Sequence, residues 1–423
     1  MRPLTREEKR RRGRHGQVPY ISLWQRVDSQ QRACPWRRWA GMILAVLIIF
    51  NTAGWAGAAG TDGLDLRSEA AVLMEYTTGE ILVEKNPHRQ LPPASITKMM
   101  VMLLVMEAVA AGEIKLSDVV VTTPEAARMG GSQIWLEPGE EMTVAELLKA
   151  VSIVSANDAS YALAEHVAGS HELFVEMMNK RAQELGLANT RYVNATGLDP
   201  DGGGEGNITT AHDMAVLARE LLKHPTILQW TGTWIDSLRG GESFLRNTNN
   251  LVRFYEGCDG LKTGYTDEAG YSLVGTAQRN NVRVIAVVMK APTSAARNSD
   301  ITKLFNYGFS RFKALPVAKS GDKVGKIRVI KGEDREVEVL VGKDLILVVK
   351  REEQGEPEVE IALPPHVKAP LARGERVGEA LVKMGGEVKA RADLVAAADV
   401  AEVGFFRFLL QVTRDFFSVF FGG

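Results

Sequence analysis

Residues 92–100 read PPASITKMM, and they place a serine three positions before a lysine at the start of a long apolar run. The run continues to Ala111 and is followed by Gly112, a pattern that predicts a buried helix beginning at Ser95. Residues three positions apart on a helix share one face, so Ser95 and Lys98 are expected to lie side by side. Burial disfavours the charged form of an amine. Lys98 is therefore a candidate base for a nucleophilic Ser95 at the positive end of the helix dipole.

The spacing of this pair is not specific by itself, because Ser310 and Lys313 repeat it at a polar helix end. Two further tripeptides support the first pair. SAN (155–157) is the only S-x-N in the chain and lies inside an apolar helical segment. KTG (262–264) is the only K-T-G and lies just before a predicted strand. In this order, the three motifs form the set shared by β-lactamases and penicillin-binding proteins.

The order of the predicted elements around these motifs indicates an α+β domain. Segment 69–86 alternates polar and apolar residues around Thr77-Thr78-Gly79, which predicts a β-hairpin. Further segments are predicted as helices at 143–169, 171–185 and 210–224, as a second hairpin at 270–279 and 282–291, and as a last helix at 295–313. Strands at both ends with helices between them predict a mostly antiparallel sheet with a helical cluster against it.

Beyond Pro316 the chain becomes rich in Val and Ile. Alternating segments bounded by Gly or Pro lie at 326–332, 335–351 and 357–364. They predict a small, sandwich-like all-β domain over 316–400. The following tail, 401–423, has one polar stripe at helical spacing among many Phe residues, formed by Arg407, Gln411, Arg414, Asp415 and Ser418. This pattern predicts an amphipathic helix in the membrane interface, with docking on the β domain or on a dimer partner as the alternative.

The start of the chain has the pattern of a secretory signal. Residues 1–39 carry eleven Lys or Arg and three acids, and the stretch from there to residue 58 carries no charge. The apolar run 40–50 and the small residues Ala56-Gly57-Ala58 predict a signal peptide over 1–58, cleaved after Ala58. The alternative is an uncleaved anchor over 39–59. In both cases the body of the chain is exported, and the tail helix would hold it at the outer face of the cytoplasmic membrane.

Composition limits the partners of the exported part. It carries about nine more acidic than basic residues, which argues against nucleic acid, since that partner needs clustered cations. Cys34 lies in the predicted signal and leaves Cys258 alone, so no internal disulfide is expected. His166 and His171 lack the spacing of a zinc-binding helix. We expect neither a metal nor another cofactor.

From about residue 64 to 400 the chain resembles the low-molecular-mass penicillin-binding proteins, specifically the D-alanyl-D-alanine carboxypeptidases of bacterial cell walls. The resemblance rests on PPASITKMM, SANDA, NTNNLV (247–252) leading to DGLKTG, and AGYSLVG (269–275). It implies a β-lactamase/DD-peptidase-like domain over 62–313, followed by the β domain and the membrane helix. It also implies a peptidoglycan stem peptide ending in D-Ala-D-Ala as substrate, and β-lactam antibiotics as covalent inhibitors.

The resemblance assigns catalytic roles to four side chains. Ser95 would attack the carbonyl between the two D-alanines, and Lys98 would take its proton. Ser155 would pass a proton to the departing amine, while Asn157 would hold the substrate amide and orient the lysine. The backbone amides of Ser95 and Tyr265 would form the oxyanion hole.

The same resemblance assigns the residues that bind substrate. Lys262 would attract the terminal carboxylate, and Thr263 would offer it a hydroxyl. Gly264 would let the substrate lie along the strand edge without a Cβ clash. Arg297 aligns with an arginine that helps to bind the carboxylate. Tyr265 stands where some relatives carry histidine, a difference expected to affect pH dependence and the deacylation of penicillin.

Other functions that use the same motifs remain open on the sequence. A class A β-lactamase would also carry a glutamate in a Glu-x-x-Leu-Asn context between Asn157 and Lys262, and none is present. A DD-endopeptidase that cleaves peptide cross-links would use identical residues. An inactive wall-binding module is disfavoured because the motif residues are intact. Asp158, Asp199 and Asp201 are interpreted as caps or loop residues.

Overall fold

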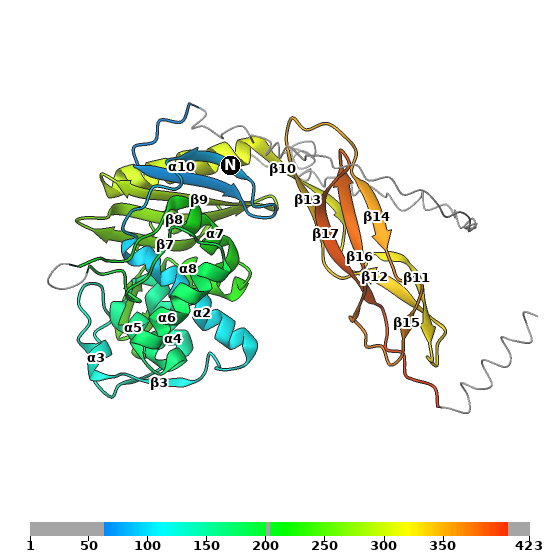
Figure 1. Cartoon of the computed structure of the whole chain (residues 1–423), viewed down its shortest axis with the longest axis horizontal. Helices are drawn as coiled ribbons and strands as arrows, with labels where there is room; N and C mark the ends of the chain where they lie inside the picture. Colours follow the sequence, from blue (N-terminus) through cyan, green and yellow to red (C-terminus); the bar gives the residue numbers. More distant parts are fainter. Residues whose placement is uncertain (1–62, 200–203, 405–423) are drawn as a thin grey trace, which may run out of the picture. The chain divides into compact units, whose positions relative to one another are not determined.

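The computed structural model describes residues 63–199 and 204–404 (Figure 1). The predicted signal peptide over 1–58 and nearly all of the predicted tail helix over 401–423 lie outside these ranges. Within the described ranges the chain forms two compact units, one ending at Lys313 and the other beginning at Ala314.

The first unit is built on a five-stranded antiparallel sheet, in which strands from the start of the unit pair with strands from its end. The strand order is β2-β1-β9-β8-β7 (Figure 1). The strands are β1 (Ala70–Glu75), β2 (Ile81–Lys85), β7 (Cys258–Thr266), β8 (Gly270–Arg279) and β9 (Val282–Ala291). Both predicted hairpins are confirmed. Asn280 and Asn281 have φ values of 47° and 63° between β8 and β9, the left-handed conformation that tight hairpin turns require.

The two faces of this sheet bury different helices, as the alternation of strand side chains requires. Val72 and Ile285 belong to the core shared with the helical cluster, to which α7 (Ala211–Leu221) contributes. Leu73 and Val284 face the other way and lie against Gly308 of α10 (Ser294–Arg311). Figure 1 shows α10 and α7 on opposite sides of the sheet. The predicted mostly antiparallel sheet with helices against it is therefore confirmed.

Helix α2 (Lys98–Ala111) is the centre of the helical cluster. Its side chains are buried almost all round, and Gly112 ends it with φ of 75°. Among the described residues, stretch 94–111 is the one helical segment apolar and long enough to cross a membrane, but 72% of it is buried inside the protein. It is surrounded by α4 (Val144–Ile153), α5 (Asn157–Ala168), α6 (His171–Glu184) and α7. Shorter elements complete the unit: η2 (Ala94–Thr97), β3 (Val119–Val121), α3 (Pro124–Ala127), β4 (Glu141–Thr143), η3 (Pro225–Ile227), α8 (Leu228–Thr231), β5 (Ile235–Leu238), η4 (Arg239–Gly241), β6 (Ser243–Arg246) and α9 (Leu251–Phe254).

Two local predictions were wrong. The first turn of the predicted helix at Ser95 is the 3₁₀ helix η2, and the α-helix begins at Lys98. The helix predicted over 143–169 is interrupted between α4 and α5, where Ser155 has φ of 66°. The K-T-G motif does lie ahead of β8, as predicted, but it is itself part of β7, a strand that the sequence did not indicate.

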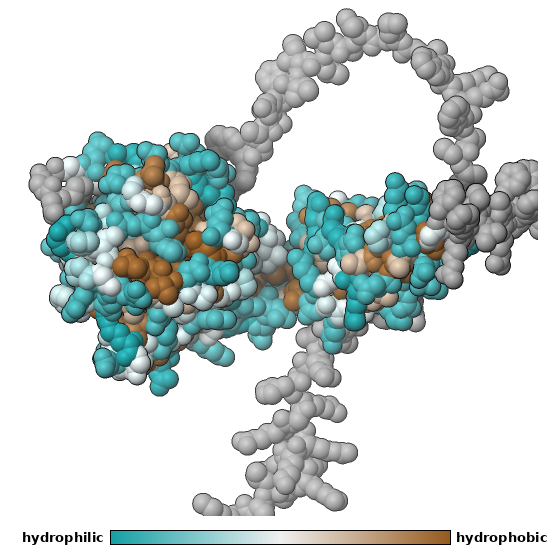
Figure 2. All heavy atoms as spheres, turned by 90° about the horizontal axis from the view of Figure 1, so that it is seen from below, coloured by the Kyte–Doolittle hydropathy of each residue, from teal (hydrophilic) through white to brown (hydrophobic). Residues whose placement is uncertain are grey.

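The second unit is all-β, as predicted. A six-stranded sheet has the order β14-β16-β17-β12-β11-β15, and β10 pairs with β13. The strands are β10 (Phe312–Ala318), β11 (Lys323–Ile330), β12 (Glu336–Val341), β13 (Leu345–Lys350), β14 (Glu358–Ala362), β15 (Val367–Lys368), β16 (Arg376–Met384) and β17 (Glu387–Ala396). Val339, Leu347 and Leu394 are fully buried in its core. Figure 2 shows a mainly hydrophilic surface on this unit, and larger apolar patches on the first unit.

Candidate active site

Ser95 and Lys98 lie together at the start of α2. The Lys98 side chain is fully buried, and its Nζ lies 2.8 Å from Ser95 Oγ. The same amine donates to the carbonyl oxygen of Thr196 at 2.7 Å. Burial lowers the pKa of Lys98 well below its ordinary value, the nearby charge of Lys262 lowers it further, and Asp158 acts in the opposite direction. The amine is therefore held next to the hydroxyl in an environment that favours its neutral form.

The carbonyl of Thr196 belongs to a loop that the sequence did not single out. Asn194 Oδ1 accepts hydrogen bonds from the backbone N–H groups of Thr196 and Gly197 and so fixes the turn. Asn207 Nδ2 donates to Thr97 Oγ1, at 3.0 Å, and to the backbone oxygen of Asn194. Gly197 has φ of 81°, and a Cβ there would overlap the carbonyl of Ala94. The Asn-x-x-Gly spacing at 194–197 is the one sequence signal that marks this turn.

Ser155 and Asn157 lie in the break between α4 and α5. Asn157 Nδ2 donates to the carbonyl oxygen of Gly130 at 2.7 Å. Ser155 Oγ and Asn157 Oδ1 are buried and have no hydrogen-bond partner among the described residues. Buried polar atoms are normally satisfied, so these two atoms, at the first and third positions of the motif, are available to hydrogen-bond with a ligand or with water. Asp158 lies in the first turn of α5, not at its cap, and it accepts hydrogen bonds from the backbone N–H groups of Ile134 and Leu136, which is a structural role.

The K-T-G motif lies on β7, the edge strand of the sheet. Lys262 is 1% exposed, and burial followed by the charge of Arg297 lowers its pKa to about 7. Thr263 Oγ1 lies 2.7 Å from Thr248 Oγ1, a contact that the NTNNLV stretch makes with this strand. A Cβ at Gly264 would lie 2.7 Å from the carbonyl oxygen of Pro93, so β7 approaches the chain around Ser95 as only glycine permits.

Tyr265 and Arg297 occupy different environments. Tyr265 is 50% exposed, its hydroxyl donates to Asp267 Oδ1 at 2.7 Å, and its ring lies against Tyr271 with centroids 4.3 Å apart. Arg297 is 5% exposed in the first turn of α10, and burial lowers its pKa to about 10. It is close enough to Lys262 for its charge to lower the lysine pKa. The charge of Arg297 thus acts on the pKa of Lys262, and the charge of Lys262 acts on the pKa of Lys98.

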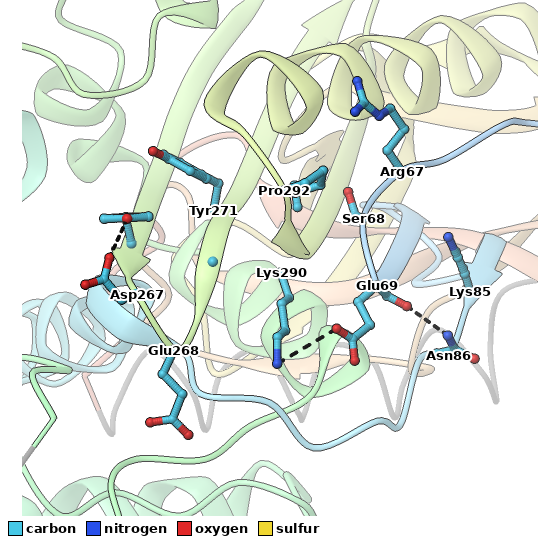
Figure 3. A pocket seen from close by; sticks show the side chains of 13 residues that line it. Arg67, Ser68, Glu69, Lys85, Asn86, Asp267, Glu268, Tyr271, Lys290 and Pro292 are labelled. Atoms are coloured by element: carbon cyan, nitrogen blue, oxygen red, sulfur yellow. Dashed lines mark hydrogen bonds and ion pairs between the residues drawn. The ribbon is translucent and has the colours of Figure 1, made fainter.

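A cavity of about 700 Å³ begins at Tyr265 and crosses the end of the sheet (Figure 3). Its charged lining includes both signs, and Lys290 points toward Glu69, with 3.9 Å between Nζ and Oε2. Neither Ser95 nor Lys98 lines it. The cavity therefore shares Tyr265 with the motif residues but does not include the Ser95–Lys98 pair.

The second serine–lysine pair is not assembled. Ser310 Oγ donates to the carbonyl oxygen of Tyr307 at the exposed end of α10. Lys313 lies beyond that helix in β10. Across residues 63–199 and 204–404, no group of three His, Cys, Asp or Glu residues is placed to hold a metal ion. Cys258 is a buried free thiol.

Comparison with known proteins identifies the family to which this fold and these motifs belong. The family model D-alanyl-D-alanine carboxypeptidase matches residues 57–293, and the model for the C-terminal domain of penicillin-binding protein 5 matches residues 312–402. The chain is similar to the solved structure of penicillin binding protein 5 from Haemophilus influenzae, with 32% identity, a TM-score of 0.60, and coverage of 80% of this chain and 99% of that one. It is also similar to a peptidoglycan synthesis regulatory factor from Streptococcus pneumoniae, with 31% identity, a TM-score of 0.66, and coverage of 80% and 100%. The fold is that of the low-molecular-mass penicillin-binding proteins.

Sequence relatives give the same result. The chain is 44% identical to D-alanyl-D-alanine carboxypeptidase DacF of Bacillus subtilis over 88% of this chain and 97% of that protein. It is 33% identical to D-alanyl-D-alanine carboxypeptidase DacC of Escherichia coli over 86% and 91%. The chain belongs to the D-alanyl-D-alanine carboxypeptidase family.

Proposed function

We propose that the protein is a serine-type D-Ala-D-Ala carboxypeptidase that removes the terminal D-alanine from peptidoglycan stem peptides through an acyl-enzyme on Ser95. The observation that carries this proposal is the buried Lys98 amine, 2.8 Å from Ser95 Oγ and with a strongly lowered pKa. Family membership supports the carboxypeptidase activity. The identity of the nucleophile and the base is the part that remains to be tested.

Acylation proceeds in three steps. Ser95 Oγ attacks the carbonyl carbon between the two D-alanines while Lys98 takes the hydroxyl proton. The backbone N–H groups of Ser95 and Tyr265 stabilise the oxyanion, a contribution of about 3 kcal/mol per donor. Ser155 donates its hydroxyl proton to the amine of the terminal D-alanine as the C–N bond breaks, and it recovers a proton from the protonated Lys98, so free D-alanine leaves and Lys98 is neutral again. Water then attacks the ester, Lys98 takes a proton from that water and returns one to Ser95 Oγ, and the shortened stem peptide leaves as a carboxylate.

Substrate selection follows from the buried cations and the unsatisfied polar atoms. Lys262 and Arg297 attract the free carboxylate of the last D-alanine, and the Thr263 hydroxyl orients it. Asn157 Oδ1, which lacks a partner, accepts the N–H of the substrate amide. This chemistry requires a free carboxylate next to the scissile bond. A β-lactam presents a carboxylate and a reactive amide in the same relation, and it acylates Ser95.

The tests are acylation and D-alanine release. Ser95→Ala should abolish both the release of D-alanine from a pentapeptide ending in D-Ala-D-Ala and covalent labelling by fluorescent penicillin. Ser310→Ala, in the second serine–lysine pair, should leave both unchanged. Labelling of the Ser95→Ala variant would place the nucleophile elsewhere. Incubation with cross-linked muropeptide dimers and mass analysis of the products separates a carboxypeptidase from an endopeptidase, because only the endopeptidase releases monomers.

A further inference from the structure

A short loop between α3 and β4 holds the catalytic asparagine in place. The carbonyl oxygen of Ser132 accepts a hydrogen bond from the Asn157 backbone N–H at 2.7 Å, and that of Gly130 accepts from its side chain. Gly131 has φ of 74°, and a Cβ there would lie 2.8 Å from Asn157 Nδ2. Residues 130–136, called here the 130–136 loop, therefore form one wall of the site that contains Asn157.

The 130–136 loop presents an exposed tryptophan at this wall. Trp135 is 73% exposed and has φ of 61°, a left-handed conformation that a bulky side chain rarely adopts. The residues on both sides of it are held in place, because the buried Asp158 carboxylate accepts hydrogen bonds from the backbone N–H groups of Ile134 and Leu136. A rigid backbone thus keeps a large aromatic ring in solvent, where it has no role in the core.

A second clamp holds the same loop from the β5–β6 hairpin. Arg239 donates to the carbonyl oxygen of Ile134 at 3.0 Å and more weakly, at 3.4 Å, to that of Trp135. Its guanidinium also forms an ion pair with Glu140 at 2.7 Å. The chain leaving β6 reaches Thr248, which contacts Thr263 of the K-T-G motif. The loop and the hairpin are therefore connected to the site at two separate points, near Asn157 and near Thr263.

The path of the substrate brings one of its residues to this wall. Under the proposed function, an extended substrate peptide would add to the free edge of β7, with its terminal carboxylate at Lys262 and Arg297. The rest of the peptide would then run along β7, opposite the wall formed by the 130–136 loop. An extended residue spans about 3.5 Å, so the residue before the two D-alanines begins within about 7 Å of the scissile bond. A sugar joined to the far end of the stem lies several residues farther away.

We propose that Trp135 is a specificity-determining residue whose ring contacts the aliphatic side chain of the residue preceding D-Ala-D-Ala. This inference rests on the proposed function, because it uses the same substrate and the same orientation. The flat indole face gains free energy from covering a long alkyl chain, and it gains nothing from glycine at that position. The enzyme therefore prefers stem peptides with a long aliphatic side chain in the third position.

The test compares two acetylated tripeptides that end in D-Ala-D-Ala, one starting with Nε-acetyl-lysine and one starting with glycine. In the wild type, kcat/KM for the lysyl peptide should exceed that for the glycyl peptide by about tenfold, the discrimination expected of one apolar contact. Trp135→Ala should remove this preference by lowering only the lysyl value, and Trp135→Phe should keep most of it. Phe254→Ala is the matched control, since Phe254 is 74% exposed but lies outside the 130–136 loop. It should leave the ratio unchanged.

Several results would overturn the assignment of Trp135. If Trp135→Ala leaves the ratio of the two kcat/KM values unchanged, or lowers both values equally, the ring does not contact this side chain. A loss seen only with a disaccharide-linked pentapeptide would assign the ring to the sugar instead. Penicillin labelling separates the two proposals, because it should persist in Trp135→Ala. If the wild type neither reacts with penicillin nor releases D-alanine from either peptide, the proposed function fails and the role of Trp135 fails with it.

Discussion

In the proposed mechanism, two buried lysines have opposite requirements. Lys98 would act as a neutral amine that accepts a proton, whereas Lys262 would act as a cation that attracts a carboxylate. Burial is the largest cause of the lowered pKa of both amines, and each is further lowered by a neighbouring cation. The lowered pKa of Lys262 works against the positive charge that it needs. Binding of the substrate carboxylate restores that charge, because a nearby anion favours the ammonium form. The lysine at the nucleophile gains no such anion from the substrate, so it stays neutral.

This difference predicts a pH profile. In the free enzyme the pKa of Lys262 is about 7, so kcat/KM should fall as the pH rises through that value and the amine loses its charge. The corresponding limb of kcat should lie at higher pH, because the bound carboxylate raises the pKa of the amine. Lys262→Arg keeps a positive charge over the whole range. Its kcat/KM, measured from about pH 5 to about pH 10, should lose the alkaline limb even if its maximum is lower. An alkaline limb that is the same in both proteins would assign the titration to another group.

At the scale of secondary structure, the close approach of β7 to the 3₁₀ turn at Ser95 positions the catalytic residues. A Cβ at Gly264 would lie 2.7 Å from the carbonyl oxygen of Pro93 and 3.2 Å from the backbone nitrogen of Ile96. Both contacts involve backbone, which cannot move aside as the end of a flexible side chain can. A larger residue must therefore move the strand away from the nucleophile.

Gly264→Ala should slow acylation by fluorescent penicillin at least about tenfold, the size of effect expected when a reacting group is displaced by a fraction of an ångström. The protein should still fold, because the change is confined to an edge strand. Gly325→Ala in β11, where a Cβ meets nothing within 4 Å, is the matched control and should react at the wild-type rate. Wild-type acylation by the Gly264→Ala variant would show that the close approach is not needed.

Sequence periodicity predicted the helices and strands that bury apolar side chains. It missed the elements and breaks that polar residues and glycines form. The two hairpins and α2 follow from alternation and from an apolar run. Strand β7 has the sequence CDGLKTGYT (258–266). Its buried lysine and its two glycines interrupt the alternation of apolar and polar residues by which a strand is recognised. The left-handed Ser155 lies within an apolar helical pattern that gives no sign of a break. Lys98 donates a hydrogen bond to the backbone carbonyl oxygen of Thr196. Every residue has such a carbonyl, so the sequence could not indicate this acceptor. The motif set thus supplied the candidate site residues, while their hydrogen-bond partners required coordinates.

For the whole molecule, the open question is where the two units act. On the face seen in Figure 2 the second unit is mainly hydrophilic and the first unit has larger apolar patches, and the sequence from residue 59 onward carries about nine excess acidic residues. A net negative charge gives no overall electrostatic attraction to an anionic membrane surface. The two candidate anchors are segment 39–59, if it is not cleaved, and the predicted tail helix over 401–423. Family membership supports export and leaves the choice between these anchors open.

We predict that the tail helix is the anchor. Its apolar face, with Phe408, Phe416 and Phe420, would be buried in the interface, and its polar stripe would face water. Deleting residues 404–423 should move the signal-processed protein from the membrane fraction to the soluble fraction, without loss of penicillin labelling. Phe416→Asp should weaken attachment because it places a charge on the apolar face, whereas Ser418→Ala on the polar stripe should not. If the deleted protein stays on membranes and retains its first 58 residues, the N-terminal segment is the anchor and the tail must pack elsewhere.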